Sequence, residues 1–306
     1  MIDPGRVLVT GASGFIGRHV VPLLQGRGFD VHAIGRNQAD LLIPGISAAL
    51  IDRIKPTHLL HLAWYAVPGR FWVAPDNLNW VAASLLLHRA FAAAGGKRAV
   101  YVGTCAEYDW SHSLLDETET PCAPATLYGI AKDSLRRLLQ ASAEGVQLAW
   151  GRVFFLYGPH EAPTRLVPDV ITSLFAGREA MCGDGLAERD FLHVADAAAA
   201  LVALLESNVT GPVNIASGVC LPLREIIIRI AEQIGRPELV YLGMRPAPLP
   251  APRRLAAVVR RLTDEVGFCP AYSLDEGLAE TIAWWRKACA TEQSPKVHAE
   301  AIIRHH

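Results

Sequence analysis

The sequence predicts an α/β fold built on a parallel sheet, with a smaller lobe in its C-terminal half. The apolar run 7–9 is short enough to be a buried parallel strand, a glycine-rich turn follows it, and residues 15–24 repeat apolar side chains with a helical period. Between residues 159 and 168, prolines and charged residues replace the periodic pattern. We therefore expect a first domain over residues 1–160, a second lobe over 161–290 with some segments returning to the first domain, and a tail over 291–306.

Composition narrows the class of protein. A chain of 306 residues can form one large or two smaller domains, and its 51% hydrophobic and 19% charged residues indicate a large packed core. A formal net charge of −1 gives no electrostatic reason to expect nucleic acid or an anionic membrane as a partner. The longest apolar stretch, around residues 197–205, is far too short to span a bilayer.

Cysteine usage and the N-terminus indicate the compartment. The six cysteines are scattered, with neither a C-x-x-C pair nor the spacing of metal ligands: Cys105, Cys122, Cys182, Cys220, Cys269 and Cys289. We interpret them as reduced thiols of a cytosolic protein and expect no metal site. The first residues also lack the basic and apolar regions of a signal peptide, so the sequence predicts a cytoplasmic protein.

The turn after the first strand carries three glycines at equal spacing, Gly11-x-x-Gly14-x-x-Gly17. The first permits a sharp reversal, the second lets backbone N–H groups approach a pyrophosphate, and the third lets the helix pack on the strand. The helix N-terminus then faces the phosphates with partial positive charge. An ordinary strand-to-helix turn is the alternative. The dinucleotide interpretation predicts cofactor contacts from Gly11, Ser13, Gly14, Phe15, Ile16 and Gly17.

The second predicted strand, 29–34, ends where a dinucleotide-binding fold recognises the adenosine ribose. An acidic side chain there would accept a hydrogen bond from the 2′-hydroxyl, whereas this chain has Gly35 and Arg36. A guanidinium can bind a 2′-phosphate, which favours NADP over NAD. An arginine exposed in a loop is the alternative. Asp40, followed by Leu41, is predicted to contact the adenine amine.

Alternating helices and strands complete the predicted first domain. A helix over 47–54 precedes a strand over 58–63, in which His61 is interpreted as a hydrogen-bonded core residue. Ala63 and Trp64 would end that strand near the phosphates and nicotinamide, and Leu62 is a further predicted cofactor contact. A helix over 75–94 ends at two glycines, and a strand over 99–103 then delivers Thr104 to the carboxyl edge of the sheet, where ligands bind in such folds.

Tyr128 and Lys132 are the pair that carries chemistry. Four residues apart on a predicted helix over 127–143, they lie on one face. A free tyrosine titrates near ~10, too high for proton exchange at neutral pH, and a neighbouring ammonium lowers that pKa. The Y-x-x-x-K spacing arises readily by chance, but with Thr104 and the glycine turn it predicts a hydroxyl, a tunable phenol and a lysine around one carbonyl position.

These motifs resemble those of extended short-chain dehydrogenases/reductases of the NAD(P)-dependent epimerase/dehydratase family, which act mostly on nucleotide sugars. The resemblance covers nearly the whole chain, to about residue 286. The matching segments are Thr10–Gly17, His61–Ala63, Asn79, Thr104, Tyr128 with Lys132, Tyr157–Pro159, Gly183–Gly185, Arg189–Asp196, Val213–Ile215, Glu265–Pro270 and Ile282–Trp285.

The resemblance implies a Rossmann-like doubly wound domain, a smaller C-terminal lobe that binds the nucleotide sugar, and catalysis by Thr104, Tyr128 and Lys132. In that scheme Lys132 also holds the nicotinamide ribose, and Tyr128 contacts the cofactor. It further assigns Arg189 to the substrate diphosphate, with a structural ion pair to Asp190 or Glu188 as the alternative.

The remaining predictions for the second half follow from its residues alone. Asp196 is predicted to be the N-cap of a helix over 197–205. The proline-rich stretch 246–252 should be a loop. Arg253 and Arg254 behind it are candidates for a second diphosphate contact. The polar tail beyond Arg286 is predicted to be frayed.

Three departures from the family pattern narrow the function. Dehydratases carry an acid pair after the threonine of the triad, whereas this chain has Cys105 and Ala106. Many epimerases have an asparagine in the slot that holds Phe155. Gly35 and Arg36 replace the NAD-type acid. The sequence therefore predicts NADP(H)-dependent reduction of a nucleotide-linked 4-keto (deoxy)sugar, with a nucleotide-sugar 4-epimerase as the first alternative.

A non-catalytic NADP-binding sensor is a more remote alternative, against which the intact Thr104, Tyr128 and Lys132 argue. In this family the helices equivalent to 75–94 and 127–143 often form a four-helix dimer interface. The first carries the apolar cluster Leu85, Leu86, Leu87 and Phe91. We therefore predict a homodimer, unless those side chains face the domain's own sheet.

Overall fold

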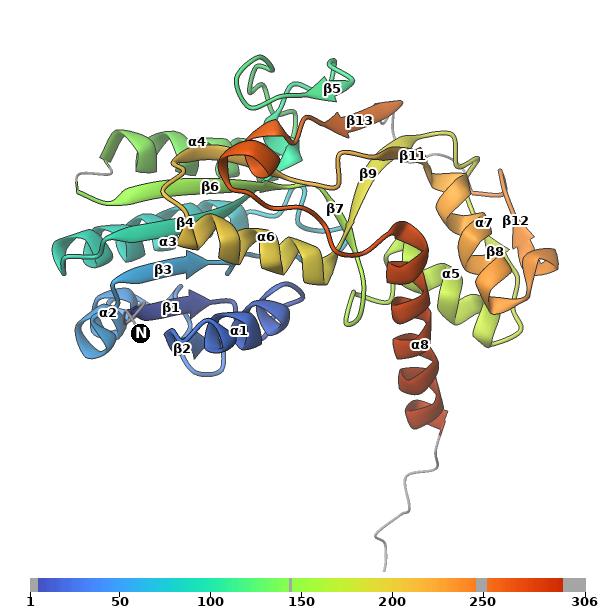
Figure 1. Cartoon of the computed structure of the whole chain (residues 1–306), viewed down its shortest axis with the longest axis horizontal. Coiled ribbons are helices and arrows are strands. Elements are labelled where there is room, and N and C mark those ends of the chain that lie inside the picture. The colour runs from blue at the N-terminus through green and yellow to red at the C-terminus, as the bar shows by residue number, and fades with distance from the viewer. Residues whose placement is uncertain (1–4, 143–144, 246–251, 294–306) are drawn as a thin grey trace, which may run out of the picture.

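The computed structural model describes residues 5–142, 145–245 and 252–293 (Figure 1). Its larger part is a six-stranded sheet in the order β10-β6-β4-β3-β1-β2, and every pairing in it is parallel. The strands are β1 (Arg6–Thr10), β2 (Asp30–Ile34), β3 (His58–His61), β4 (Arg98–Thr104), β6 (Gln147–Val153) and β10 (Gly211–Ile215). This confirms the predicted α/β fold.

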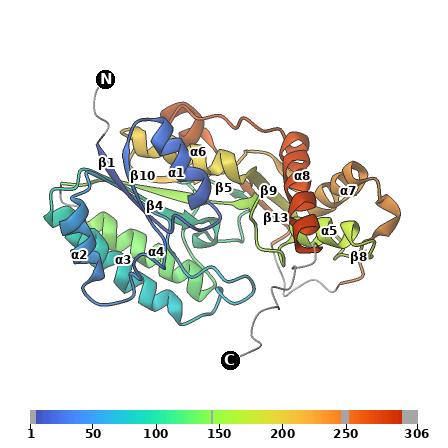
Figure 2. The ribbon, with the colours of Figure 1, turned by 90° about the horizontal axis from the view of Figure 1, so that it is seen from below.

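Helices cover both faces of this sheet (Figure 2). On one face lie α1 (Gly17–Gly26) and α6 (Val194–Glu206), and on the other lie α2 (Ile46–Ile54), α3 (Asp76–Ala93) and α4 (Leu127–Ser142). The alternation of side chains along β1 explains the two layers, because Val7 and Val9 join the core on the α1 side while Leu8 joins the other core. All three are fully buried.

A smaller lobe follows, on the right of Figure 1. Its sheet has the order β11-β9-β13-β5, with β7 also paired to β9, and a two-stranded piece joins β12 to β8. The bounds are β5 (Leu114–Leu115), β7 (Phe155–Tyr157), β8 (Ala180–Met181), β9 (Glu188–His193), β11 (Cys220–Pro222), β12 (Val240–Tyr241) and β13 (Arg254–Ala257). Helices α5 (Leu166–Phe175), α7 (Leu223–Ile234) and α8 (Leu274–Gln293) pack together around a third core.

Short helical turns complete the chain: η1 (Cys105–Glu107), η2 (Pro237–Leu239) and η3 (Arg261–Glu265). Segments of the second half return to the first, since α6 packs beside α1 and β10 extends the six-stranded sheet. The predicted helices and strands of the first half differ from the structure by at most two residues at their ends. The first helix begins at Gly17 rather than residue 15, because the chain is still in the glycine turn before it.

The predicted N-cap role of Asp196 is wrong. His193 occupies the N-cap position of α6, and Asp196 lies three residues further on, in the first turn. Its buried carboxylate accepts hydrogen bonds from the backbone N–H groups of Ala271 and Tyr272, at 2.9 and 3.1 Å. Asp196 therefore holds the segment that leads into α8.

The frayed tail predicted beyond Arg286 is also wrong in part, because α8 continues to Gln293. The remaining tail residues, 294–306, and most of the predicted proline-rich loop, 246–251, lie outside the described residues. Within the described ranges, no helix has the length and apolar character needed to cross a bilayer.

Candidate active site

The candidate site lies at the carboxyl edge of the six-stranded sheet, where β1, β3 and β4 end side by side. Gly11 follows β1 with a φ of +71°, a backbone conformation that favours glycine. A Cβ at this position would lie 2.7 Å from the backbone nitrogen of Ala63, just after β3. A Cβ at Gly17 would likewise collide with the Gly11 carbonyl and Ala12. The glycines thus bring the turn, the helix and the next strand within contact.

This turn forms one side of a cavity of about 620 Å³. Helix α1 has no side-chain cap, so its N-terminal N–H groups can bind a phosphate. The glycine cradle and the cavity therefore fit a dinucleotide. The structure brings eleven predicted cofactor residues together along this cavity: Gly11, Ser13, Gly14, Phe15, Ile16, Gly17, Arg36, Asp40, Leu41, Leu62 and Ala63. Their role in binding remains a prediction. Asn79 is exposed and lines a different groove, between α2 and α3.

The far end of the cavity contains the predicted ribose-recognition residues. A Cβ at Gly35 would lie 2.7 Å from the Ser13 hydroxyl oxygen, so any side chain at this position requires Ser13 to move. Arg36 is exposed, and its Nε lies 3.2 Å from the Asp40 carboxylate. That carboxylate also accepts a hydrogen bond from the Leu42 N–H, which together with the Arg36 contacts holds the pKa of Asp40 below its usual range.

Thr104 and Tyr128 come together at the end of β4 and the start of α4. The Thr104 hydroxyl accepts a hydrogen bond from the Ala106 N–H at 3.2 Å. Burial raises the pKa of Tyr128, while hydrogen bonding with Thr104 and the charge of Arg165 act in the opposite direction. Burial has the larger effect, so the phenol keeps its proton at neutral pH. Arg165, at the N-cap of α5, was not predicted as part of the site.

Lys132 is buried and lies on α4, one helical turn after Tyr128. Its ammonium donates to the Val102 carbonyl at 2.7 Å and lies 3.7 Å from the centre of the Trp64 ring. Burial lowers the pKa of Lys132 to about 7, and the Glu107 carboxylate opposes this shift. His61 is the hydrogen-bonded core histidine that the sequence predicts, since Thr10 and Ser84 contact its two ring nitrogens at 2.7 and 2.9 Å.

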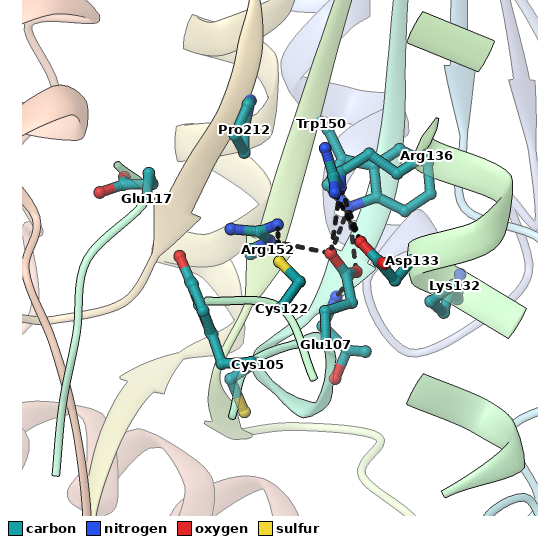
Figure 3. A network of polar contacts seen from close by, with 12 residues as sticks. Cys105, Glu107, Glu117, Cys122, Lys132, Asp133, Arg136, Trp150, Arg152 and Pro212 are labelled. Carbon is teal, nitrogen blue, oxygen red and sulfur yellow. Dashed lines mark hydrogen bonds and ion pairs between the residues drawn. The ribbon is translucent and has the colours of Figure 1, made fainter. Parts of the chain in front are cut away.

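Glu107 links Thr104 to Trp150 and Arg152 of β6, a role that the sequence analysis missed (Figure 3). This fully buried carboxylate accepts hydrogen bonds from the Thr104 N–H at 2.8 Å, from the Trp150 indole at 2.9 Å and from Arg152 Nε at 2.8 Å. With the Thr104 hydroxyl it forms a reciprocal capping box around η1. Arg136 Nε lies 4.0 Å away. The network fixes the backbone from which the Thr104 hydroxyl projects.

Three half-buried aromatic residues, Phe71, Trp72 and Trp110, form what we term the aromatic wall of Tyr128. The rings of Phe71 and Trp72 meet the Tyr128 ring edge-on, with centroids 4.9 and 5.8 Å away, and Trp110 meets Trp72 at 6.1 Å. The Tyr128 N–H also donates to the Trp72 carbonyl at 3.1 Å. The sequence analysis missed this wall, although the density of aromatic residues in 64–72 was a visible signal.

The predicted substrate residues lie in the second lobe. Arg189 is buried, donates to the Glu188 carbonyl and lies 5.4 Å from the Phe155 ring centre. With Phe191 and other residues it lines a cavity of about 200 Å³. Arg253 is exposed and lies outside both cavities. Arg254 forms an ion pair with Glu188 at 3.2 Å.

Cys105 is buried, and burial raises its pKa to about 12, so its thiol cannot exchange protons at neutral pH. In the described part of the chain, no three His, Cys, Asp or Glu side chains are arranged to hold a metal ion.

Comparison with known proteins identifies the family of the chain. Residues 7–216 match the NAD dependent epimerase/dehydratase family. The chain is 28% identical to a dTDP-4-dehydro-6-deoxy-D-allose reductase of Streptomyces bikiniensis, over 92% of this chain and 96% of that protein. It superposes on a UDP-glucose 4-epimerase of Thermotoga maritima, solved with UDP-glucose, with a TM-score of 0.83 and 25% identity over 93% and 99% of the two chains.

A third relative is MoeE5, solved in complex with UDP-glucuronic acid and NAD. It is 30% identical, with a TM-score of 0.80, over 93% of this chain and 100% of that one. The family match covers more than half of the chain, and the fold extends the likeness into the second lobe. This chain therefore belongs to the NAD-dependent epimerase/dehydratase family and is an NAD(P)-dependent enzyme.

Proposed function

We propose that this enzyme uses NADPH to reduce the keto group of a nucleotide-linked 4-keto-6-deoxysugar. The observation that carries the proposal is the group formed by Thr104, Tyr128 and Lys132, in which Lys132 contacts Trp64, a residue that lines the cavity that fits a dinucleotide. Cys105 and Ala106, at the positions of the dehydratase acid pair, supply no acid or base. Dehydration is therefore excluded from the proposal.

The protonation state of Tyr128 favours reduction. Its raised pKa keeps the phenol protonated, so Tyr128 can donate a proton to the carbonyl oxygen of the sugar. The Thr104 hydroxyl hydrogen-bonds the same oxygen, and a protonated Lys132 stabilises the phenolate that forms. An enzyme that starts by oxidising an alcohol needs the phenolate first. The nicotinamide, when bound, supplies the hydride.

Arg36 and the aromatic wall refine the cofactor and the substrate. Arg36 is exposed at the cavity, where its guanidinium can bind the 2′-phosphate of NADP. An acidic side chain at Gly35, which would bind the ribose 2′-hydroxyl of NAD, would collide with Ser13. The aromatic wall offers an apolar surface beside Tyr128, which suits a sugar whose hydroxyl at carbon 6 has been removed. Arg189 is proposed to bind the diphosphate of the nucleotide, and Arg253 to add a second contact.

We further propose that cofactor binding belongs mainly to residues 1–160 and nucleotide-sugar binding mainly to 161–290. A nucleotide-sugar 4-epimerase is the second candidate, favoured by the likeness to the Thermotoga maritima epimerase. The same three residues would oxidise and then reduce one carbon. An NADP-binding sensor is disfavoured, because it does not need a proton donor beside the cofactor.

Cofactor stoichiometry tests the proposal. Purified enzyme is mixed with NADPH and a panel of UDP-, dTDP-, GDP- and CDP-linked 4-keto-6-deoxysugars, and the absorbance of reduced nicotinamide is followed against product. A reductase consumes one NADPH per sugar. Interconversion of two nucleotide sugars without net loss of NADPH would replace this proposal with the epimerase.

The variant Tyr128→Phe links that activity to the site. Loss of the phenol proton should lower kcat by about 10²–10⁴-fold while leaving NADPH affinity within a factor of a few. Tyr241→Phe, an exposed tyrosine on β12, is the matched control and should retain full activity. A Tyr128→Phe enzyme that keeps its rate would exclude Tyr128 as the proton donor.

A further inference from the structure

Lys132 is a buried cation whose ammonium contacts a backbone carbonyl and an aromatic ring. Only 4% of its surface is exposed, and one N–H of its ammonium donates to the Val102 carbonyl at 2.7 Å. The ammonium nitrogen also lies 3.7 Å from the centre of the Trp64 ring, over the ring face. An aromatic face attracts a cation through its quadrupole, and tryptophan does so most strongly.

Trp64 is fixed in this position by the segment between β3 and α3. Its indole N–H donates to the Asn77 side-chain oxygen at 2.9 Å. Asn77 is fully buried, and its amide donates to the Phe71 and Ala74 carbonyls at 2.7 and 2.9 Å. Trp64 also lines the dinucleotide cavity. The indole is therefore held between the cavity and the lysine.

The other titratable groups around Lys132 come from three elements. Glu107 of η1 is the neighbouring carboxylate that raises the pKa of Lys132 (Figure 3). His61 of β3 is neutral, because burial and the charge of Lys132 lower its pKa to about 3. Tyr128, on the same helix as Lys132, keeps its proton because burial raises its pKa. Burial thus has a larger effect on the pKa of Lys132 than the Glu107 carboxylate has. The ring face of Trp64 is a second group that stabilises the ammonium.

We propose that Trp64 is a positioning residue for Lys132: its ring face holds the ammonium beside the dinucleotide cavity and stabilises its charged form. The inference rests on the proposed function in taking Lys132 as part of the catalytic group. It adds that the residue directly after the His61–Ala63 segment sets the upper pH limit of the reaction.

Ring fluorination tests the inference without changing the shape of the side chain. Tryptophan at position 64 is replaced by its 5-fluoro, 5,7-difluoro and 4,5,6,7-tetrafluoro analogues, which progressively weaken the attraction of the ring face for a cation. The chain has five lysines, Lys55, Lys97, Lys132, Lys287 and Lys296. In the cofactor-free protein, ε-¹³C-lysine NMR therefore gives the pKa of Lys132, with its signal assigned by Lys132→Arg.

The expected result is a stepwise fall in the pKa of Lys132, by about 0.5–1.5 units in total. The sign follows because a weaker ring face stabilises the ammonium less. The same analogues at position 110 are the control, since the Trp110 indole is bound by the Cys105 carbonyl rather than contacting Lys132. A pKa that stays constant along the series at position 64 would overturn the inference.

Activity provides a separate readout. If deprotonated Lys132 is inactive, the alkaline limb of kcat against pH moves to lower pH along the series, in the same direction as the pKa. A falling pKa in a protein that reduces none of the 4-keto sugars would overturn the proposed function alone. A constant pKa in an active reductase would overturn only the role of Trp64.

Discussion

Arg36 and Asp40 occupy the position that distinguishes NADP from NAD. Arg36 Nε lies 3.2 Å from the Asp40 carboxylate, and 70% of its side chain is exposed. An exposed ion pair of this kind contributes little to stability, so the guanidinium can exchange Asp40 for a 2′-phosphate at small cost.

The first prediction follows from this exchange. A charge-assisted hydrogen bond contributes about 1.5–3 kcal/mol, so NADPH should bind roughly tenfold or more tightly than NADH. Arg36→Ala should remove that preference and leave NADH affinity unchanged, as measured by calorimetric titration. Arg27→Ala is the control: Arg27 lies at the C-terminal end of α1, opposite the end that faces the cavity, and its loss should change neither affinity. Equal affinities of the native enzyme for the two cofactors would contradict the prediction.

At the scale of single residues, the sequence identified the parts of the site that local geometry determines. The glycine turn is readable because φ and close contact restrict the residue type, and eleven predicted residues line one cavity. The long-range contacts of Glu107 and Trp64 could not be identified in this way. Their partners, Arg152 and Lys132, are 45 and 68 positions away in the chain, and nothing in the local pattern indicates such contacts.

The short helical turn η1 is the element that positions Thr104 for the proposed catalysis. Its three residues hold Thr104 through the carboxylate of Glu107, which is itself bound by Arg152 and Trp150. Removing one partner of a buried ion pair leaves the other charge without compensation, whereas surface pairs contribute little.

We therefore expect Glu107→Gln to lower the free energy of unfolding by about 3–5 kcal/mol. It should also reduce kcat, because the neutral amide leaves one acceptor oxygen for the N–H groups of Thr104, Trp150 and Arg152 and directs an NH₂ donor at the others. Urea unfolding and NADPH consumption measure the two effects. Glu206→Gln breaks an exposed pair with Arg27 and should cost less than about 1 kcal/mol. Equal stability of the two variants would show that the Glu107 network does not support η1.

The elements themselves were predictable to different degrees. A strand such as β1 is recognised as a short apolar run, and a helix such as α1 by the helical period of its apolar residues. In contrast, β5, β7, β11 and β13 are two to four residues long, and their partners are distant in the sequence. Their pairing around β9 depends on the packing of the whole lobe, which no short window contains. The resemblance to the family anticipated the lobe but not this sheet.

At the scale of the whole molecule, α3 and α4 lie side by side on one face of the sheet (Figure 2). The apolar cluster that suggested a dimer is divided between two faces of α3. Leu87 and Phe91 are fully buried against the domain's own sheet, whereas 54% of Leu86 is exposed. Leu78 of α3 and Ile130 and Leu138 of α4 are exposed as well, so both helices carry apolar side chains on the surface of the molecule.

The last prediction is a homodimer formed through this surface. A two-fold dimer places the same patch of each protomer in contact, so one added charge meets its own copy across the axis. Leu86→Glu combined with Leu138→Glu should therefore convert the dimer to a monomer, as measured by light scattering at micromolar concentration. Ile228→Glu is the control, because it adds a charge to an exposed position on α7 in the other lobe and should leave the mass unchanged. A native protein that is monomeric at this concentration would contradict the prediction, and the exposed residues of α3 and α4 would then be an ordinary solvated surface.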